Sequence, residues 1–315
     1  MPNYFFKATE GAHAQLTKLY DFVWPTASAM WNLRWQVAGY LQAVPNATVE
    51  QLKARFTEGA DIHGANLKRA CVEHSWDEQK ENFARILLVN TIAVYEGWID
   101  EVLDSLGKKT RELTTALQFP NSTAKDGKGA AWAIAQITNP ESSALKAAFY
   151  PVLSKGRYFA LQKLDALLLC YRLFKELRNC DMHGGGIATQ RLLDAYSQFA
   201  VVANSASLGV AEVPVHHPAA LGGKVKLSLR GVVGFSHLVL KLIDTIDAEL
   251  SRSQAAERVF VKQWQVVHSR RLNFRLAPGK PKNRVKKAVM KAGFPRPEDP
   301  ETFGIWLRGE NLVDY

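Results

Sequence analysis

Apolar residues recur at steps of three and four along most of the chain, which is the spacing of helices that bury one face. The segment 158–182 is apolar on nearly all sides, as expected of the central helix of a bundle. Residues alternate within 205–230, where "KVKLSLR" favours a short β-hairpin or a loop insertion. The pattern predicts a mainly α fold, with helices over 12–44, from Thr48, and over 77–106, 141–149, 158–182, 189–203 and 232–250.

Local signals place the breaks between these helices. Pro25 in "WPT" should interrupt or restart the first helix, because proline removes a backbone donor and clashes with the preceding turn. Thr48 and Gln51 have the spacing of a capping box. Three glycines at 184–186 should end the central helix, since glycine tolerates the left-handed backbone. We therefore expect an N-terminal helical extension over 1–76, a helical bundle over 77–256 and a C-terminal arm over 257–315.

The composition narrows the class of protein. With 315 residues, of which 47% are hydrophobic, the chain can bury a large core and is not a disordered protein. Its apolar runs are far shorter than the roughly 20 residues of a membrane span, and we see no secretory signal. Cys71, Cys170 and Cys180 are odd in number and form no CxxC pair, which favours a reducing compartment. We expect a cytoplasmic protein outside the membrane.

The positive charge is concentrated near the C-terminus. The net charge is +10, and residues 258–297 hold twelve Lys or Arg but no Asp or Glu. A segment of such unmixed charge favours RNA or another nucleic acid as partner. A solvated tail, or an arm that docks on an acidic partner, would have the same composition. The candidate RNA-binding residues are Arg270, Arg271, Arg275, Lys280, Lys282, Arg284, Lys286 and Lys287.

The stretch "LRNCDMHGG" brings Arg178 and His183 to the predicted end of the central helix. Positions five apart on a helix point about 140° apart, so we expect convergence only because the glycines release the backbone at His183. A forked, permanently charged guanidinium suits phosphate oxygens, and imidazole exchanges a proton near neutral pH. The pair fits metal-free phosphodiester transfer in RNA. Alternatively, it only caps the carbonyls of the helix end.

These residues resemble the motif of the HEPN superfamily (higher eukaryotes and prokaryotes nucleotide-binding), in which an arginine precedes a histidine by four to six positions. In that motif a polar residue, often asparagine, commonly follows the arginine, as Asn179 follows Arg178 here. The match covers about ten residues, and the helical pattern extends it over 77–250. It does not include 1–76 or 251–315, and the insertion at 205–230 departs from the compact form of the family.

The resemblance implies a HEPN-like bundle and a metal-independent ribonuclease that works as a homodimer, with two motifs in one composite cleft. It implies that Arg178 and His183 are catalytic and that Asn179 orients or binds the phosphate. Glu96 matches a polar residue that several families place on the first long helix. From the residue pattern alone, Glu96 either orients a cation or lies in water at the edge of the apolar stripe.

Other side chains leave alternatives open. Cys180 is either a buried thiol or a nucleophile. Three tryptophans of the first helix either pack the core of a helical hairpin or form a stacking platform for bases: Trp24, Trp31 and Trp35. No ligand pair at a convincing spacing supports a metal site among the remaining candidates, which are His216, His217, Asp61, His63 and His74.

The sequence thus predicts an endoribonuclease that needs no metal or cofactor and leaves a 2′,3′-cyclic phosphate and a 5′-hydroxyl. The resemblance suggests a toxin or an antiphage-defence effector under an antitoxin or an activating partner. The alternative is a non-catalytic helical module that binds RNA, a nucleotide or a protein partner. A third possibility is an effector that stays silent until it is triggered.

Overall fold

The computed structural model describes residues 4–61, 63–274 and 281–314, and the chain is mainly helical. Within these residues, two short strands and three short 3₁₀ or π turns accompany the α-helices. In chain order the elements are α1 (Lys7–Ala43), α2 (Val49–Phe56), a π-helical turn (Arg69–Glu73), α3 (Trp76–Ser105), α4 (Arg111–Ala116), a 3₁₀ turn (Lys125–Gly127), α5 (Ala130–Thr138), α6 (Ser143–Leu153), a 3₁₀ turn (Leu161–Lys163), α7 (Leu164–His183), α8 (Gln190–Ala200), α9 (Ser205–Leu208), α10 (Leu229–Leu250), α11 (Gln254–Val267), β1 (Leu272–Asn273), α12 (Pro281–Lys291), α13 (Pro300–Gly309) and β2 (Val313–Asp314).

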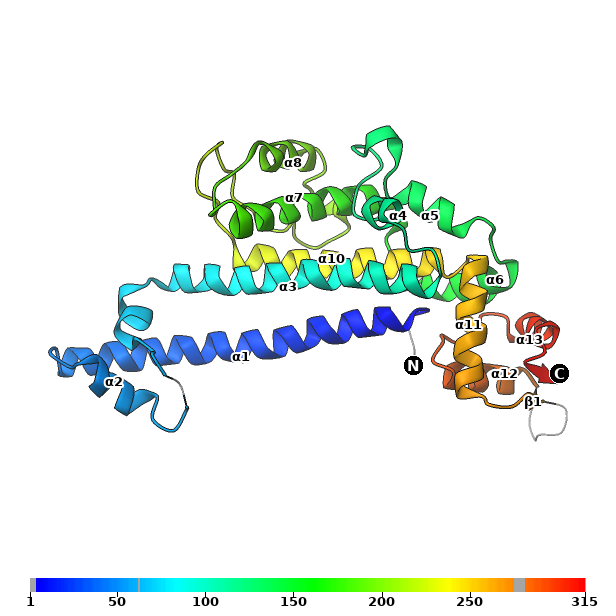
Figure 1. The fold of residues 1–315 in the computed structure, drawn as a ribbon, viewed down its shortest axis with the longest axis horizontal. Helices are drawn as coiled ribbons and strands as arrows, with labels where there is room; N and C mark the ends of the chain where they lie inside the picture. The colour runs from blue at the N-terminus through cyan, green and yellow to red at the C-terminus, as the bar shows by residue number, and fades with distance from the viewer. Residues whose placement is uncertain (1–3, 62, 275–280, 315) are drawn as a thin grey trace.

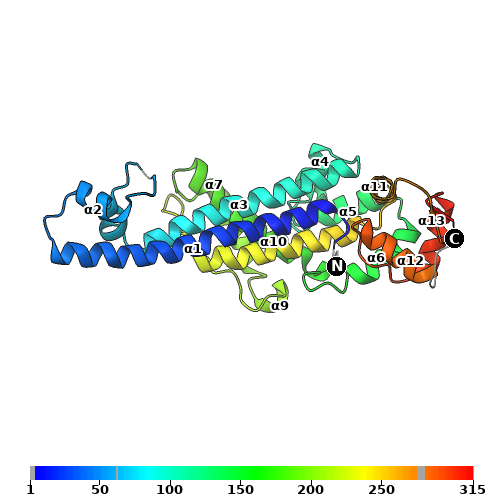
Figure 2. The ribbon, with the colours of Figure 1, turned by 90° about the horizontal axis from the view of Figure 1, so that it is seen from below.

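Four long helices, α1, α3, α7 and α10, run along the long axis of the molecule (Figures 1 and 2). Helix α10 contacts α1, α3 and α7, and its sides are buried from Val232 to Leu250 with few interruptions. A helix that is apolar on most sides is stable only inside other helices. The centre of the bundle is therefore α10, while α7 lies on the opposite side of it from α1 (Figure 1).

Helix α1 continues through Pro25, so the predicted break at "WPT" is wrong. Proline there removes one hydrogen bond, but the helix packs along α3 and α10, and this burial holds it in one piece. The predicted extension over 1–76 divides between two cores. Val23 belongs to the main core, whereas Val37 packs with Leu52 and Cys71 in a smaller one.

The N-terminal end of α1 is fixed by a buried carboxylate. Asp247 on α10 accepts hydrogen bonds from the backbone N–H groups of Phe5 (2.9 Å) and Phe6 (3.0 Å) and from the Thr9 hydroxyl (2.6 Å). Phe5 and Phe6 directly precede α1 and Thr9 lies in its first turn, so Asp247 fixes the start of α1 from another helix. Residues 242 positions apart in the chain are thereby joined.

The insertion at 205–230 is a loop rather than a hairpin. In the described structure it contains α9, followed by extended backbone in which no two segments of the insertion pair as strands. Val225 and Leu227 are buried, and the backbone N–H of Val225 donates to the carbonyl of Gly186 (2.8 Å). Alternate side chains of "KVKLSLR" are therefore buried because one side of this loop packs on the bundle. The loop forms its backbone hydrogen bond with the turn that follows α7.

The segment predicted as a basic C-terminal arm is folded. Helix α11 begins before residue 257 and leads to α12, α13 and the parallel pair β1–β2, in which Leu272 faces Val313. Phe260 and Phe303 of this segment pack against Phe149 of α6. The described part of the segment, 257–274 and 281–314, thus continues the main core at one end of the bundle (Figure 1).

Candidate functional site

The motif residues lie in the last two turns of α7, whose opposite side is buried against α10 and α3. His183 is the last helical residue, and Gly184 follows as the cap. The backbone N–H groups of Gly184 and Gly186 both donate to the carbonyl of Cys180 (3.0 Å each). Gly185 and Gly186 have φ values of +61° and +78°, which residues with a Cβ rarely adopt. The glycines end the helix as expected.

The expected convergence of Arg178 and His183 is absent from the described chain. The backbone leaves the helix after His183 instead of at it, so the imidazole stays on the helical track and is exposed to solvent. No hydrogen bond or ion pair joins it to Arg178. Asn179 and His183, four positions apart, share one face of α7, and Arg178 points about 100° away from Asn179.

Arg178 is held beside the motif by two contacts. Its Nη1 donates to Asn179 Oδ1 (3.0 Å), and its Nη2 lies 3.7 Å from Glu96 Oε2. Its Nε–H is buried and has no hydrogen-bond partner among the described atoms. Leaving a buried donor unpaired costs about 1–3 kcal/mol, so this guanidinium keeps one donor that an acceptor could use.

Glu96 lies between two cations of α7. Lys175 Nζ is 2.5 Å from Glu96 Oε1 and equally close to Gln118 Oε1, and the Tyr171 hydroxyl donates to Glu96 at 3.4 Å. Burial, with the nearby charge of Glu96, raises the pKa of Tyr171 well above its usual value. The sequence pattern leaves open whether Glu96 orients a cation or lies in water. Its contacts to Lys175 and Arg178 agree with the first interpretation.

A polar cavity of about 580 Å³ opens beside Asn179, between α3, α4, α7 and α8. Glu176 lines it and joins it to the motif, because it accepts from Asn179 Nδ2 (3.3 Å) and from Arg172 Nη2 (2.5 Å). The sequence reasoning missed Glu176, although its spacing of three from Asn179 on a helix signals a shared face. It also missed Gln118, for which a loop position gives no such signal.

A second set of charges fixes the end of α7 to α3. Arg85 donates from Nε to Asp181 Oδ1 (2.8 Å) and from Nη2 to Glu81 Oε1 (2.9 Å). Cys180 faces the interior, with its Sγ 3.6 Å from the Thr189 hydroxyl. A thiol that is 2% exposed does not meet solvent, so the geometry favours the buried-thiol interpretation.

The basic segment and the motif lie at opposite ends of α10. Arg85 binds both Asp181 of the motif and Glu81, and Glu81 accepts from the N–H of Leu227 (3.4 Å), just before α10 begins. In the basic segment, Phe294 packs on Phe5, which is bound to Asp247 near the C-terminal end of α10. Helix α10 has 22 residues and so spans about 33 Å. The described part of the basic segment, with α11 and α12, therefore lies at the other end of the bundle from α8, which follows the motif (Figure 1).

Some basic side chains of this segment have partners. Arg271 pairs with Asp314 (2.8 Å), and Lys282 lies 4.0 Å from Glu301. Arg270 and Lys287 are exposed, and Arg284 and Lys286 are half-buried. Two of the predicted RNA-binding residues, Arg275 and Lys280, lie outside the described residues.

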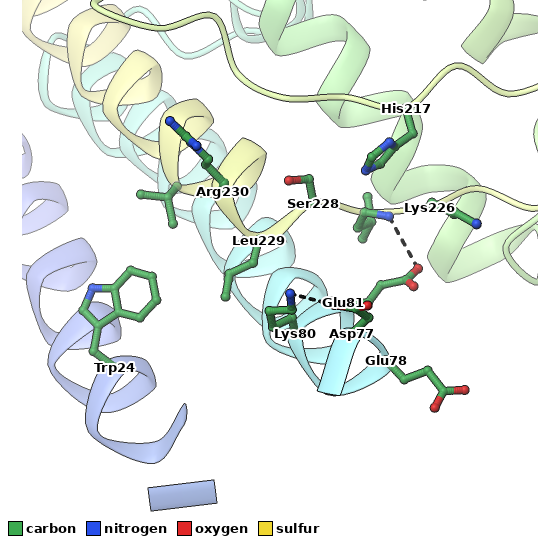
Figure 3. A pocket seen from close by; sticks show the side chains of 12 residues that line it. Trp24, Asp77, Glu78, Lys80, Glu81, His217, Lys226, Ser228, Leu229 and Arg230 are labelled. Atoms are coloured by element: carbon green, nitrogen blue, oxygen red, sulfur yellow. Dashed lines mark hydrogen bonds and ion pairs between the residues drawn. The ribbon is translucent and has the colours of Figure 1, made fainter. Parts of the chain in front are cut away.

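Another cavity, of about 730 Å³, lies between α1, the first turns of α3 and the start of α10 (Figure 3). Trp24 and Leu229 form apolar walls, and Asp77 pairs with Lys80 at 2.6 Å. Three tryptophans of α1 are 43%, 40% and 65% exposed: Trp24, Trp31 and Trp35. They do not pack the core of a helical hairpin, because Val37 and Leu52 form that core.

The histidines considered for metal binding have other neighbours. His216 Nδ1 lies 2.9 Å from the carbonyl oxygen of Pro214, His63 pairs with Asp61 on the surface, and His74 lies 3.6 Å from Glu78. Within the described ranges, no group of three or more His, Cys, Asp or Glu is placed to hold a metal ion. Across the same ranges, every helix is too short or too polar to cross a membrane.

The geometry thus offers a forked cation, an amide and an exposed imidazole at the end of α7, next to a polar cavity. Such a set can bind a phosphate and exchange a proton with it. No family model, no curated protein and no solved structure matches the chain.

Proposed function

We propose that the protein is a metal-independent endoribonuclease whose active site is the end of α7, with a HEPN-like bundle as its scaffold. One observation carries the proposal: the half-buried Asn179 and the exposed His183 share one face of α7, and Asn179 accepts a hydrogen bond from the Arg178 guanidinium. The three groups needed to hold a phosphate and move a proton therefore lie within two helical turns of one another.

In this mechanism the ribose 2′-oxygen attacks phosphorus and the bond from phosphorus to the 5′-oxygen breaks. The imidazole of His183 takes the proton of the 2′-hydroxyl and gives a proton to the leaving 5′-oxygen, an effect of about 10²- to 10⁴-fold on the rate. Asn179 donates from its amide to a phosphate oxygen. Arg178 stabilises the charge on the pentacoordinate phosphorus by about 3–4 kcal/mol. The products are a 2′,3′-cyclic phosphate and a 5′-hydroxyl.

Arg178 must turn from Glu96 to reach a phosphate near His183. Lys175 keeps Glu96 paired when Arg178 leaves, because its Nζ is already 2.5 Å from the carboxylate. A homodimer with two α7 ends facing each other would also supply the arginine of one protomer to the histidine of the other. Met182 and Ile187, which flank His183, are 54% and 39% exposed, as suits an interface.

The test uses purified protein with end-labelled tRNA and mRNA in excess EDTA. The wild type and His63→Ala, which changes an exposed histidine far along the chain, should leave cyclic-phosphate ends at equal rates. His183→Ala should lose at least 10²-fold in rate and still bind RNA. Equal cleavage by His183→Ala would reject the proposed site.

The separation of Arg178 from His183 favours a second candidate, a non-catalytic module that binds RNA, a nucleotide or a protein partner. In that case wild type and His183→Ala both bind RNA and neither cleaves it. An effector under an antitoxin or an activating partner gives cleavage only after the trigger is added, and only with His183 present. A role as a toxin or an antiphage effector would fit such a triggered ribonuclease.

A further inference from the structure

The lining of the cavity beside Asn179 has three cationic and three acidic side chains, and two further cations, Arg178 and Lys109, pair with its acids. Arg172, Lys175 and Arg191 line it, and Arg178 adjoins it through Glu96. Two carboxylates, Glu96 and Glu176, face these four cations. The third acid of the lining, Asp100, pairs with Lys109 (3.3 Å) instead. A surplus of two positive charges remains, and a cleft with such a surplus attracts anions.

Arg191 carries one of these surplus charges. It lies in the first turn of α8, is exposed, and has no hydrogen-bond or ion-pair partner among the described residues. Its neighbour across the cavity is another arginine, Arg172. Burial lowers the pKa of Arg172, and the charge of Arg191 acts in the same direction. Two guanidinium groups that repel each other are stabilised when an anion lies between them.

Arg172 is already fixed in place. Its guanidinium lies 4.1 Å above the centre of the Phe119 ring, and its Nη2 is 2.5 Å from Glu176 Oε1. A planar fork held by stacking loses little freedom when it binds a further acceptor. Its remaining N–H groups are therefore prepared for the two oxygens of one phosphate.

The cavity follows the motif along one face of α7. Arg172, Asn179 and His183 are spaced at seven and four residues, which places Arg172 about 10 Å from Asn179 along the helix axis. Glu176 connects the two by its contacts to Arg172 and Asn179. A strand of RNA bound at the motif would therefore place a second phosphate at this cavity.

From these contacts we infer that the cavity is a subsite for a second phosphate, close to the scissile one, in single-stranded RNA, bound by Arg191 and Arg172. This inference rests on the proposed ribonuclease function. Neither arginine touches the reacting atoms, so both are binding residues and not catalytic ones. Arg191 becomes paired only when the substrate is present.

The experiment measures the binding of a fluorescent single-stranded oligonucleotide with 2′-O-methyl ribose throughout, which keeps the phosphates and removes the attacking hydroxyl. Fluorescence anisotropy is recorded over a series of salt concentrations, with the full chain and His183→Ala as parent. Adding Arg191→Ala should weaken binding about tenfold and lower the slope of log affinity against log salt by about 0.7. Adding Arg191→Lys should keep the slope and recover part of the affinity.

The matched control is Arg308→Ala, which removes an exposed arginine on α13, outside the motif and outside the charge-rich stretch 258–297. It should leave affinity and slope at the parent values. Unchanged affinity and slope in Arg191→Ala would overturn the subsite, even if the wild type cleaves RNA. Binding that depends on Arg191 in a protein that never cleaves would reject the proposed chemistry and keep the phosphate site.

Discussion

At the residue scale, Asp247 makes the stability of the bundle depend on pH. It is 1% exposed, and burial raises its pKa to about 7, against the effect of the bonds from Thr9, Phe5 and Phe6. The folded chain therefore binds a proton there more tightly than the unfolded chain does. We expect the free energy of unfolding to fall by about 2–4 kcal/mol as pH rises from about 4 to 7 and then to level off. Urea titrations should show a flatter profile for Asp247→Asn, whereas Asp77→Asn, an exposed acid, should follow the wild type. Parallel profiles for all three would contradict this assignment.

At the element scale, the turn after α7 controls where the helix and its histidine end. Gly186 donates to Cys180 and accepts from Val225, with φ at +78°. Gly186→Ala should cost about 1–2 kcal/mol of stability and slow RNA cleavage, because left-handed backbone is unfavourable for alanine and His183 is three residues away. Gly186→Asn should be milder. The control, Gly39→Ala in open space within α1, should stabilise the protein by about 0.5–1 kcal/mol. Thermal unfolding and the cleavage assay measure both effects, and a neutral Gly186→Ala would show that the turn does not depend on glycine.

At the scale of the whole molecule, the motif and the basic segment are separated by the length of α10, about 33 Å. Only an RNA long enough to span that distance can contact both. The double change Lys286→Ala and Lys287→Ala should therefore weaken the binding of long RNA and lower its salt dependence, and leave short oligonucleotides unaffected. The adjacent pair Lys68 and Arg69, changed to alanine, serves as the control. Gel-shift titrations with RNAs of two lengths distinguish the cases, and an equal loss for both lengths would mean that the basic segment binds RNA beside the motif.

The helices of the bundle could be predicted because their signals are local. The expected helix over 77–106 is α3 at Trp76–Ser105, and the one over 232–250 is α10 at Leu229–Leu250. Apolar spacing and the capping residues are contained in the segment itself, so no knowledge of neighbours is needed. The continuity of α1 through Pro25 was not predictable in this way, because it depends on packing against α3 and α10.

The candidate site also has features that could be predicted from the sequence and features that could not. The position of Arg178, Asn179 and His183 at a helix end followed by glycines could be predicted, since these residues are close in the chain. It is the packing of the helices that turns Arg178 to Glu96, places Arg191 opposite Arg172, and keeps the described part of the basic segment far from the motif. Those contacts join residues from different helices. Their free energies depend on how the helices pack, and helical periodicity carries no information about which helix becomes the neighbour.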